Sequence, residues 1–429
     1  MRHRRDDHPR RVFLGLADAA GLFARMQTGL AAHGVESTTA NLMANPFGYG
    51  GGVAAPPLPV RAARAAFRRR RAASGCAPLR TVVAALAHAW LFAWAVARHD
   101  AFVFGGRVTF ARGYDLPLLR LLGKRVVCVF WGSDERPAYL DGSLMAADRG
   151  RDIRAGVAHV ARQKAEVRRL DRWSDAVIGH VLSAHLHERP VVRFTALGLP
   201  FAPNGVAPVP EPGGEPVVLH APTHPAAKGT DTIRAIVAGV RDGGARLRYD
   251  EVVGVPNAEV LRRIDGCAVV VDQLFSDVPN AGLATEAAAR RRAVIVAGYG
   301  VDELAALLPD EERAPLVYVH PRDVEARLAE LLADPGLRDS VARRAQAFVA
   351  GRCAPEAVAE RLLRVLRGDI PPDWVFDPRE LRYVRGACLD EARTRELIGA
   401  FVDYGGAAAL QVDDKPALRA ALLQFARGG

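Results

Sequence analysis

The stretch from Val269 to Gly298 reads VVVDQLFSDVPNAGLATEAAARRRAVIVAG. It begins with three consecutive valines, which is typical of a buried strand, and continues through a short loop to a helix that opens at Ala281-Gly282-Leu283. A second apolar run, Ala293–Ala297, comes shortly after the helix. Strand, helix and strand at this spacing predict two parallel strands joined by a helical crossover.

The same alternation extends along the chain in both directions from this stretch. The Pro- and Gly-rich segment Phe201–Glu215 interrupts it and is the best candidate for a domain linker. We therefore expect an α/β protein with two doubly wound parallel-sheet domains, residues 1–203 and 204–367, and a mostly helical extension, residues 368–429. Ligands of such sheets bind outside the carboxyl ends of the strands, so we expect the two domains to face a cleft. The other strands expected are Arg11–Leu16, Val35–Ala40, Ala101–Phe104, Arg125–Phe130 and Asp175–Ile178 before the linker, and Pro216–His220, Tyr249–Val253 and Leu316–Val319 after it.

The composition is that of an ordinary globular protein. Of its 429 residues 50% are apolar and 25% are charged, which excludes a disordered or collagen-like chain. A net charge of +10 favours anionic partners, but 54 of the 58 basic residues are arginines and they are dispersed along the chain. This dispersal is typical of compositional drift, so we do not expect a nucleic-acid partner.

The cysteines and the N-terminus indicate a cytoplasmic protein. The five cysteines are far apart and form no Cys-x-x-Cys pair, so we interpret them as reduced thiols. No apolar signal-peptide region precedes the first expected strand, so export is not expected. The cysteines are Cys76, Cys128, Cys267, Cys353 and Cys388.

Two expected helices in the first half bear on membranes. Thr81–Ala97 is apolar throughout, but it is short for a membrane span and contains His88, so we expect a buried helix. The preceding Arg61–Arg71 is rich in arginine and has two interpretations. A solvated basic face suits the Arg-rich composition better, and a helix lying on an anionic membrane surface, from the cytoplasmic side, is the alternative.

Two segments of the second half carry candidate chemistry. Lys228-Gly229 precedes a helix for which Thr230 or Asp231 is the expected N-cap, and a helix start beside a lysine suits a phosphate. An ordinary turn with a solvated lysine explains this segment equally well. In the second segment, amides at Gly282 and Leu283 could bind a diphosphate, and Glu286 could accept hydrogen bonds from a ribose diol. Alone, Glu286 is better explained as a complement to the helix dipole.

Taken together, these segments resemble the retaining glycosyltransferases of the GT-B fold, family 4. The resemblance is to a subgroup that carries His-Ala-Pro, Lys-Gly-Thr and Asp-Gln-Leu. It spans roughly residues 11–365 and is more specific in the second domain. The matching residues are His220-Ala221-Pro222, Lys228-Gly229-Thr230, Asp272-Gln273-Leu274 and Glu286-Ala287-Ala288-Ala289, with Phe130-Trp131-Gly132-Ser133-Asp134 in the first domain.

This resemblance implies a glycosyltransferase that uses a nucleotide-diphosphate sugar and neither a cofactor nor a metal. The acceptor would be a glycan, a lipid-linked compound or a small molecule. Lys228 and the amides near Gly282 would stabilise the departing diphosphate. Asp272, Gly229 and Leu283 are further expected donor contacts. A protein that binds a sugar nucleotide or glycan without turnover is the alternative.

Two departures favour that alternative. Val278 stands where the family has a first Glu, and Thr223 stands where it usually has an Arg. His224, beside Thr223, is a conjectural substitute for the missing phosphate contact.

In the first domain the resemblance implies that Asp134 and Trp131 contact the sugar or the acceptor, and that Gly21 lies near the donor phosphate or the acceptor. A β-turn in which Asp134 caps a helix is an equally good explanation. We expect His180, His185 and His187 to be solvated surface residues, because neither a carboxylate nor a cysteine completes a metal-ligand set near them.

Overall fold

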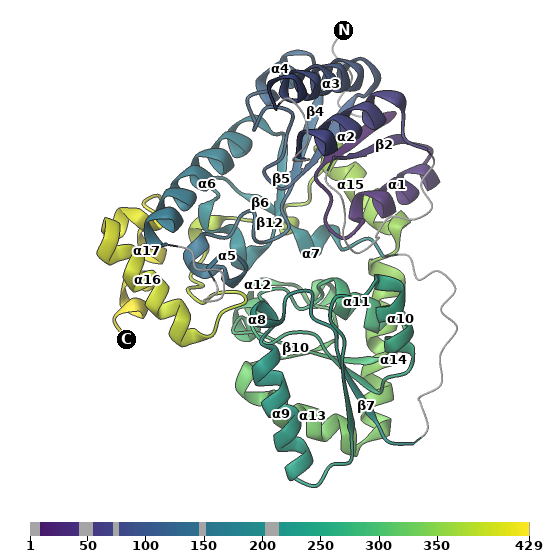
Figure 1. Cartoon of the computed structure of the whole chain (residues 1–429), viewed down its shortest axis with the longest axis vertical. Coiled ribbons are helices and arrows are strands. Elements are labelled where there is room, and N and C mark those ends of the chain that lie inside the picture. Colours follow the sequence, from purple (N-terminus) through teal and green to yellow (C-terminus); the bar gives the residue numbers. More distant parts are fainter. Residues whose placement is uncertain (1–8, 43–54, 72–76, 146–151, 202–213, 429) are drawn as a thin grey trace.

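The computed structural model describes residues 9–42, 55–71, 77–145, 152–201 and 214–428 and contains two β-sheets (Figure 1). The first has seven strands in the order β12-β6-β5-β4-β3-β1-β2, and the second has five in the order β11-β10-β9-β7-β8. Every pairing is parallel except that of β12 with β6. This confirms the expected α/β class and the GT-B arrangement of two Rossmann-like domains.

The inner strands of both sheets are buried on both faces, which is why apolar residues, above all valine, dominate them, whereas the edge strands β2, β8 and β11 are partly exposed. The first sheet consists of β1 (Arg11–Leu16), β2 (Glu36–Asn41), β3 (Ala101–Gly105), β4 (Arg125–Val129), β5 (Ala176–Gly179), β6 (Val191–Arg193) and β12 (Val375–Phe376). The second consists of β7 (Val217–His220), β8 (Arg248–Glu251), β9 (Val269–Val271), β10 (Ala293–Ala297) and β11 (Val317–Val319).

Helices cover both faces of each sheet. On the first sheet, α1 (Leu22–Ala32) and α15 (Pro355–Arg367) share one apolar core. The opposite core is covered by α2 (Leu58–Arg71), α3 (Ala77–Arg98), α4 (Leu116–Leu121) and α6 (Ile153–Trp173). On the second sheet, α9 (Thr230–Asp242) and α13 (Val324–Ala333) cover one face, and α10 (Asn257–Asp265) and α11 (Gly282–Ala289) cover the other. The remaining helices are α5 (Gly142–Met145), α7 (Phe194–Leu197), α8 (Pro225–Lys228), α12 (Val301–Leu307), α14 (Pro335–Arg352), α16 (Glu391–Gly405) and α17 (Pro416–Ala426).

The last part of the chain returns to the first domain. Helix α15 packs against α1, and β12 adds an antiparallel edge to the first sheet. Helix α16 packs on α6, and Phe401 and Leu410 are fully buried in the same core as Tyr139. The hydroxyl of Tyr139 donates a hydrogen bond to the Leu410 carbonyl oxygen over 3.0 Å. The extension of residues 368–429 is therefore part of the first domain's core.

Helix α3 contradicts the expectation of a buried helix. Leu91 and Ala95 are buried in the core, but Leu79, Leu86 and Trp90 are among the most exposed apolar side chains of the protein. The helix is apolar on both its inner and its outer face, so its periodicity could not distinguish a core helix from a surface one. By length and composition alone, residues 78–98 are also long and apolar enough to cross a membrane, which by itself is weak evidence.

Four cysteines lie in the described part of the chain, and all four are free thiols, as the sequence predicts. Cys128, Cys267 and Cys353 are buried and Cys388 is partly buried. Burial raises the pKa of the Cys353 and Cys388 thiols to about 11, so both stay protonated at neutral pH. Cys76 lies outside the described residues.

Candidate active site

Lys228 lies at the carboxyl edge of the second sheet, as the last residue of α8. Its ammonium donates a hydrogen bond to the Gln273 side-chain oxygen and lies 3.7 Å from the Asp272 carboxylate, just beyond β9. The Gln273 amide in turn donates to Ser276 Oγ over 2.6 Å. The fold thus joins the Lys-Gly and Asp-Gln-Leu segments, which are more than 40 residues apart in the chain. Lys228 is held in place by side chains of the site, so it is not the freely solvated turn lysine of the alternative interpretation.

Gly229 makes this junction geometrically feasible. Its φ of 73° lies in the left-handed region, and a Cβ there would lie 3.1 Å from the Leu274 side chain. Gly229 itself is the N-cap of α9, so the expectation of Thr230 or Asp231 in that role was wrong. Thr230 is instead buried, with its hydroxyl 2.9 Å from His220 Nε2. The tight turn next to Leu274 needs a left-handed residue at position 229, so α9 begins one residue earlier than expected.

Glu286 lies in the second turn of α11 and is 4% exposed. Its Oε1 accepts a hydrogen bond of 2.9 Å from the Asn257 side-chain amide at the start of α10. Burial raises the pKa of Glu286, while Asn257 and the positive charge of Arg25 oppose the rise. Arg25 belongs to α1 of the first domain, so Glu286 lies within electrostatic range of the opposite domain.

The start of α11 offers hydrogen-bond donors near these side chains. Gly282 is exposed and Leu283 is partly exposed. The first intrahelical hydrogen bond of α11 runs from Thr285 N to Ala281 O, so the amides of Gly282 and Leu283 precede the helical ladder. A Cβ on Gly282 would meet no atom within 4 Å, which leaves this end open to a ligand.

Asp134 occupies the facing edge of the first sheet, in the loop after β4. Its Oδ1 accepts a hydrogen bond of 2.8 Å from the Trp131 amide, and its Oδ2 is shielded from solvent with no partner among the described residues. Burial, reinforced by the neighbouring Glu135, raises the pKa of Asp134 to about 6. Gly106 allows the carboxylate this position, because a Cβ there would lie 2.6 Å from Oδ2. Asp134 therefore closes a turn of its own loop and presents an unpartnered oxygen.

Trp131 and Gly21 form the wall next to Asp134. The Trp131 indole packs against Phe23 and Phe194, and its Nε1 has no hydrogen-bond partner among the described residues. Gly21, with φ of 74°, is the N-cap of α1, and the Phe23 amide donates to Asp18 Oδ1 over 3.1 Å. Burial raises the pKa of Asp18 to about 6. A second carboxyl group with a raised pKa thus lies at the same edge of the first sheet.

Arg136 connects the two domains and was missed by the sequence analysis. Its guanidinium donates to Asp277, which follows β9 in the second domain, with an Nε–Oδ2 distance of 2.9 Å, and also to Asp141 over 3.0 Å. Ser183 Oγ donates to the same Asp277 oxygen over 2.7 Å. Arg136 lowers the pKa of Asp277, which keeps this carboxylate charged. The only sequence signal was the position of Arg136 and Asp277 in loops at strand ends.

His180, His185 and His187 are buried, so the expectation of solvated histidines was wrong. They follow β5 in the first domain, in a segment that the C-terminal extension covers. His185 Nε2 is 2.8 Å from the Tyr383 carbonyl oxygen of that extension. Burial lowers the pKa of His180 and of His185 to about 4. His187 lies between Asp171 and Glu135, whose charges outweigh burial and raise its pKa to about 9.

The C-terminal extension also reaches the site. The Cys388 amide donates to the Phe275 carbonyl oxygen over 2.6 Å, beside Asp277, and a Cβ on Gly142 would collide with the Cys388 carbonyl group. Cys388 lies within electrostatic range of Lys228 and Arg136. The extension therefore joins the two strand edges.

The fold brings most of the expected site residues to two facing edges. Lys228, Gly229 and Asp272 lie at the edge of the second sheet, and the charge of Asp272 reaches Glu286. In the first domain the charge of Asp134 acts on His180, and so does that of Asp277 from the second. The two sets thus meet at the domain junction.

His224, Thr223 and Val278 are the positions at which the sequence departs from the resembled motif or could replace a missing contact. The His224 Nδ1 caps α8 by accepting from the Ala227 amide over 3.3 Å, and Thr223 is exposed. The Val278 amide donates to Ser276 Oγ over 3.1 Å. The conjectured phosphate contact of His224 is thus not tested by the structure, and the ring serves as an N-cap.

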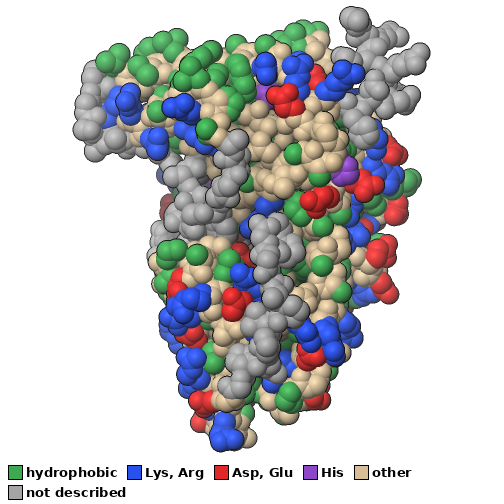
Figure 2. All heavy atoms as spheres, turned by 90° about the vertical axis from the view of Figure 1, so that its right-hand side faces the viewer, with side chains coloured by type: hydrophobic (Ala, Val, Ile, Leu, Met, Phe, Trp, Pro, Cys, Tyr) green, Lys and Arg blue, Asp and Glu red, His purple; other side chains and the backbone are tan. Residues whose placement is uncertain are grey.

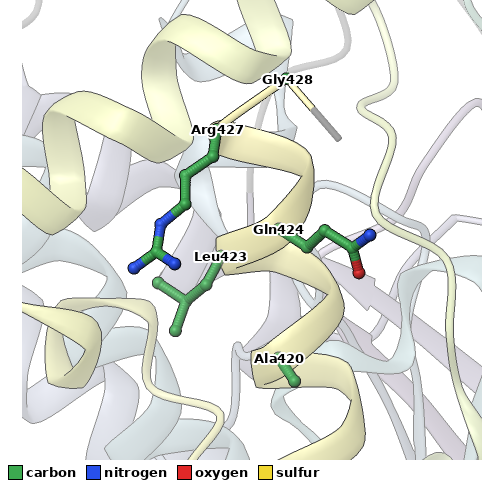
Figure 3. A pocket seen from close by; sticks show the side chains of 5 residues that line it. All are labelled: Ala420, Leu423, Gln424, Arg427 and Gly428. Atoms are coloured by element: carbon green, nitrogen blue, oxygen red, sulfur yellow. The ribbon is translucent and has the colours of Figure 1, made fainter.

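Two further features of the described residues bear on ligands. Among the described residues, no group of three or more His, Cys, Asp or Glu side chains is placed to hold a metal ion. A hollow of about 530 Å³ lies on α17 and shares no residue with the site (Figure 3). It is lined by Ala420, Leu423, Gln424, Arg427 and Gly428.

The chain matches no family model and no curated protein in sequence. Among solved structures it is similar to Anabaena HepE in complex with UDP and glucose, with 13% identity, a TM-score of 0.44 and coverage of 84% of this chain and 99% of that one. It is also similar to an α-glucosyltransferase in complex with UDP and DNA, with 12% identity, a TM-score of 0.49 and coverage of 84% of this chain and 100% of that one. A third similar structure is the spinosyn rhamnosyltransferase SpnG complexed with thymidine diphosphate. It has 15% identity and a TM-score of 0.40, and the match covers 82% of this chain and 99% of that one. These scores are all below 0.5, so the function proposed below rests on the geometry of the chain itself.

Proposed function

We propose that this protein is a glycosyltransferase that moves a sugar from a nucleotide-diphosphate donor to an acceptor. The observation that carries the proposal is the position of Lys228. Gln273 and Asp272 hold its ammonium at a sheet edge that also carries the open start of α11 and the buried Glu286. A cation, free helix amides and a carboxylate together match the diphosphate and the ribose diol of a nucleotide sugar.

The same groups would perform the chemistry. When the bond between the anomeric carbon and the diphosphate oxygen breaks, its electron pair remains on the diphosphate. The oxygen of the acceptor hydroxyl forms the new glycosidic bond, and its proton passes to the departing diphosphate. The growing negative charge is stabilised by Lys228 and by the amides of Gly282 and Leu283. Asp134, across the domain junction, would position the sugar or the acceptor through its unpartnered Oδ2.

The finer features of the proposal come from the motif resemblance. They are retention of configuration, a family 4-like hexosyl transfer and independence of metal ions. The acceptor would be a glycan, a lipid-linked compound or a small molecule, and the site of action would be the cytoplasm. Retention is tested by the anomeric configuration of the product in NMR, and metal independence by turnover in the presence of a chelator.

A protein that binds a sugar nucleotide or glycan without turnover is the second candidate. Val278 and Thr223 replace an acidic and a basic residue of the resembled motif. In addition, Arg136 of the first domain donates a hydrogen bond to the carboxylate of Asp277, the residue directly before Val278. Such a protein would bind the donor as tightly as an enzyme does but would not consume it.

A two-step experiment separates the candidates. Thermal-shift screening against UDP-, GDP- and TDP-sugars identifies the donor, and donor hydrolysis by the stabilised protein is then followed by release of the nucleoside diphosphate. Stabilisation with turnover supports the transferase, and stabilisation without turnover supports the binding protein. If no sugar nucleotide raises the melting temperature, the transferase and the sugar-nucleotide-binding protein are both wrong, and glycan binding is the one form of the second candidate that is left.

A further inference from the structure

The outer face of α3 is apolar and exposed. Leu79, Val82, Leu86 and Trp90 recur at helical spacing along this face and are between 46% and 66% exposed. Figure 2 shows hydrophobic side chains gathered along the upper end of the molecule, with Lys and Arg side chains beside them. The neighbouring α4, on the same side of the sheet, adds Leu118 and Leu121, and its C-cap Leu122 follows. These three side chains are between 43% and 83% exposed.

The inner face of α3 is fixed to the domain. Leu91 and Ala95 are fully buried in the core beneath it. His88 Nε2 lies 2.8 Å from the Phe110 carbonyl oxygen, and the Phe92 ring packs edge-on against Phe110. Moving the whole helix into a bilayer would expose these core contacts, so α3 is anchored as a helix that lies on the surface.

The charged side chains of α2, α3 and α4 themselves are all positive, and Arg98 at the end of α3 pairs with Glu36 of β2. Residues 55–98 contain eight arginines and no aspartate or glutamate. On α2, which packs against α3, the side chains of Arg61, Arg68, Arg69 and Arg70 are exposed. On α4, Arg120 is also exposed. An apolar strip flanked by cations matches a surface that offers hydrocarbon beneath a layer of negative charge.

We propose that the outer faces of α2, α3 and α4, here called the docking face, attach the first domain to the surface of an anionic membrane. The apolar side chains of α3 enter the boundary between headgroups and acyl chains, and the arginines of α2 remain at the level of the phosphates. This attachment does not depend on the proposed glycosyl transfer, because the docking face shares no residue with the candidate active site.

Flotation with lipid vesicles tests the proposal. The full-length protein is mixed with vesicles of phosphatidylcholine containing phosphatidylglycerol, and separately with vesicles of phosphatidylcholine alone. We expect flotation with the anionic vesicles at low salt, weaker flotation at moderate salt, and little with the neutral vesicles. Absence of binding to anionic vesicles at low salt would overturn the proposal.

Variants locate the contact on the docking face. Leu86→Glu or Trp90→Glu should lower the vesicle partition coefficient at least about tenfold. Tyr404→Glu is the matched control, because Tyr404 is an exposed aromatic residue on α16, 54% exposed against 46% for Trp90. Equal loss in Tyr404→Glu, or no loss in the two α3 variants, would contradict the assignment. Arg68→Ala with Arg69→Ala should weaken binding by roughly fivefold for each charge removed.

Two other occupants of the face give different results. If α3 spanned the membrane, the bound protein would resist extraction by alkaline carbonate, whereas the proposal predicts its release. If a second copy covered the face, light scattering would show a dimer in solution that Leu86→Glu dissociates, with no flotation of the wild type. Either result would overturn membrane attachment.

Discussion

Glu286 lies in an environment unlike that of an ordinary helix carboxylate. It is buried, it accepts a hydrogen bond from Asn257, and burial raises its pKa. A group that only complemented a helix dipole would have no need of this environment at the second turn. The observed position therefore favours a carboxylate kept for a ligand over the helix-dipole explanation.

Replacing Glu286 should weaken sugar-nucleotide binding. Loss of hydrogen bonds to a ribose diol in Glu286→Ala should cost roughly 1.5–3 kcal/mol of binding free energy, measured by calorimetry. Glu286→Gln, which can still accept from Asn257, should retain the fold and lose part of the affinity. Glu330→Ala on α13 is the control and should bind normally. Unchanged affinity in a folded Glu286→Ala protein would refute the role.

Asp134 should make stability depend on pH. Its pKa is raised to about 6 in the folded protein, so the folded state holds the proton more tightly than the unfolded chain does. The protonated group therefore favours folding below about pH 4, and this contribution is lost as the pH rises through 6.

The measurement compares the wild type with Asp134→Asn by urea unfolding. Between pH 4 and 7 the free energy of unfolding of the wild type should fall relative to that of the variant by about 1–2 kcal/mol. Asp18, whose pKa is also about 6, titrates equally in both proteins and cancels in the difference. A constant difference across this range would show that Asp134 has an ordinary pKa.

At the scale of the elements, the turn between α8 and α9 determines where Lys228 lies. Gly229 adopts φ of 73° against Leu274, and Gly244, with φ of 95°, has open space around it. Alanine at either position should cost about 1–2 kcal/mol of stability, because both backbones are left-handed. Only Gly229→Ala should also weaken nucleotide binding, since its Cβ displaces Leu274 and with it Lys228. Equal nucleotide affinity in the two variants would show that the turn does not position the lysine.

Many of the strands, and the loops that follow them, could be predicted from the sequence. The strand expected at Arg11–Leu16 has the observed bounds, and the Lys228 and Asp272 segments, which the sequence places after two strands, lie next to each other in the structure. Such short-range patterns are reliable because apolar runs report burial in a parallel sheet. Finding these strands and segments did not require knowing how distant parts of the chain pair with one another.

The errors have a common physical cause, which is that burial depends on segments remote in sequence. His180, His185 and His187 are buried because the extension around Tyr383 covers them, almost 200 residues later. Helix α3 is exposed because no other segment of the described chain covers its outer face. Apolar periodicity reports which side chains avoid water, and it does not report what excludes the water.

At the scale of the whole molecule, two buried ion pairs fasten the domains together. Arg136 pairs with Asp277, and Arg193 pairs with Glu312 over 2.7 Å, with Thr195 donating to the same carboxylate over 2.6 Å. Each pair joins a strand end of the first sheet to a loop of the second domain. The orientation of the two site edges therefore depends on charges that are far from each other in sequence.

Removing one member of the first pair should be costly. Asp277→Ala leaves the Arg136 guanidinium with Asp141 as its one remaining carboxylate partner, and the free energy of unfolding should fall by about 3–5 kcal/mol. Adding Arg136→Leu to this variant should cost less than Arg136→Leu costs in the wild type, because only the buried Asp141 carboxylate, and no longer that of Asp277, is then left without its cation. Urea unfolding of the two single variants and the double variant gives the coupling. Additive losses would mean that the pair does not couple the domains.

The central claim is that the edge of the second sheet binds a nucleoside diphosphate through Lys228, and kinetics of Lys228→Ala test it most directly. Because charge grows on the departing diphosphate, this variant should lower kcat by on the order of 10²-fold, with a smaller change in KM. Lys228→Arg should restore activity in part, since a planar guanidinium does not reproduce a compact charge. Lys124→Ala, a lysine whose ammonium donates to the His99 carbonyl oxygen in the first domain, should keep the wild-type kcat. A Lys228→Ala protein with the wild-type kcat on its donor would contradict the account.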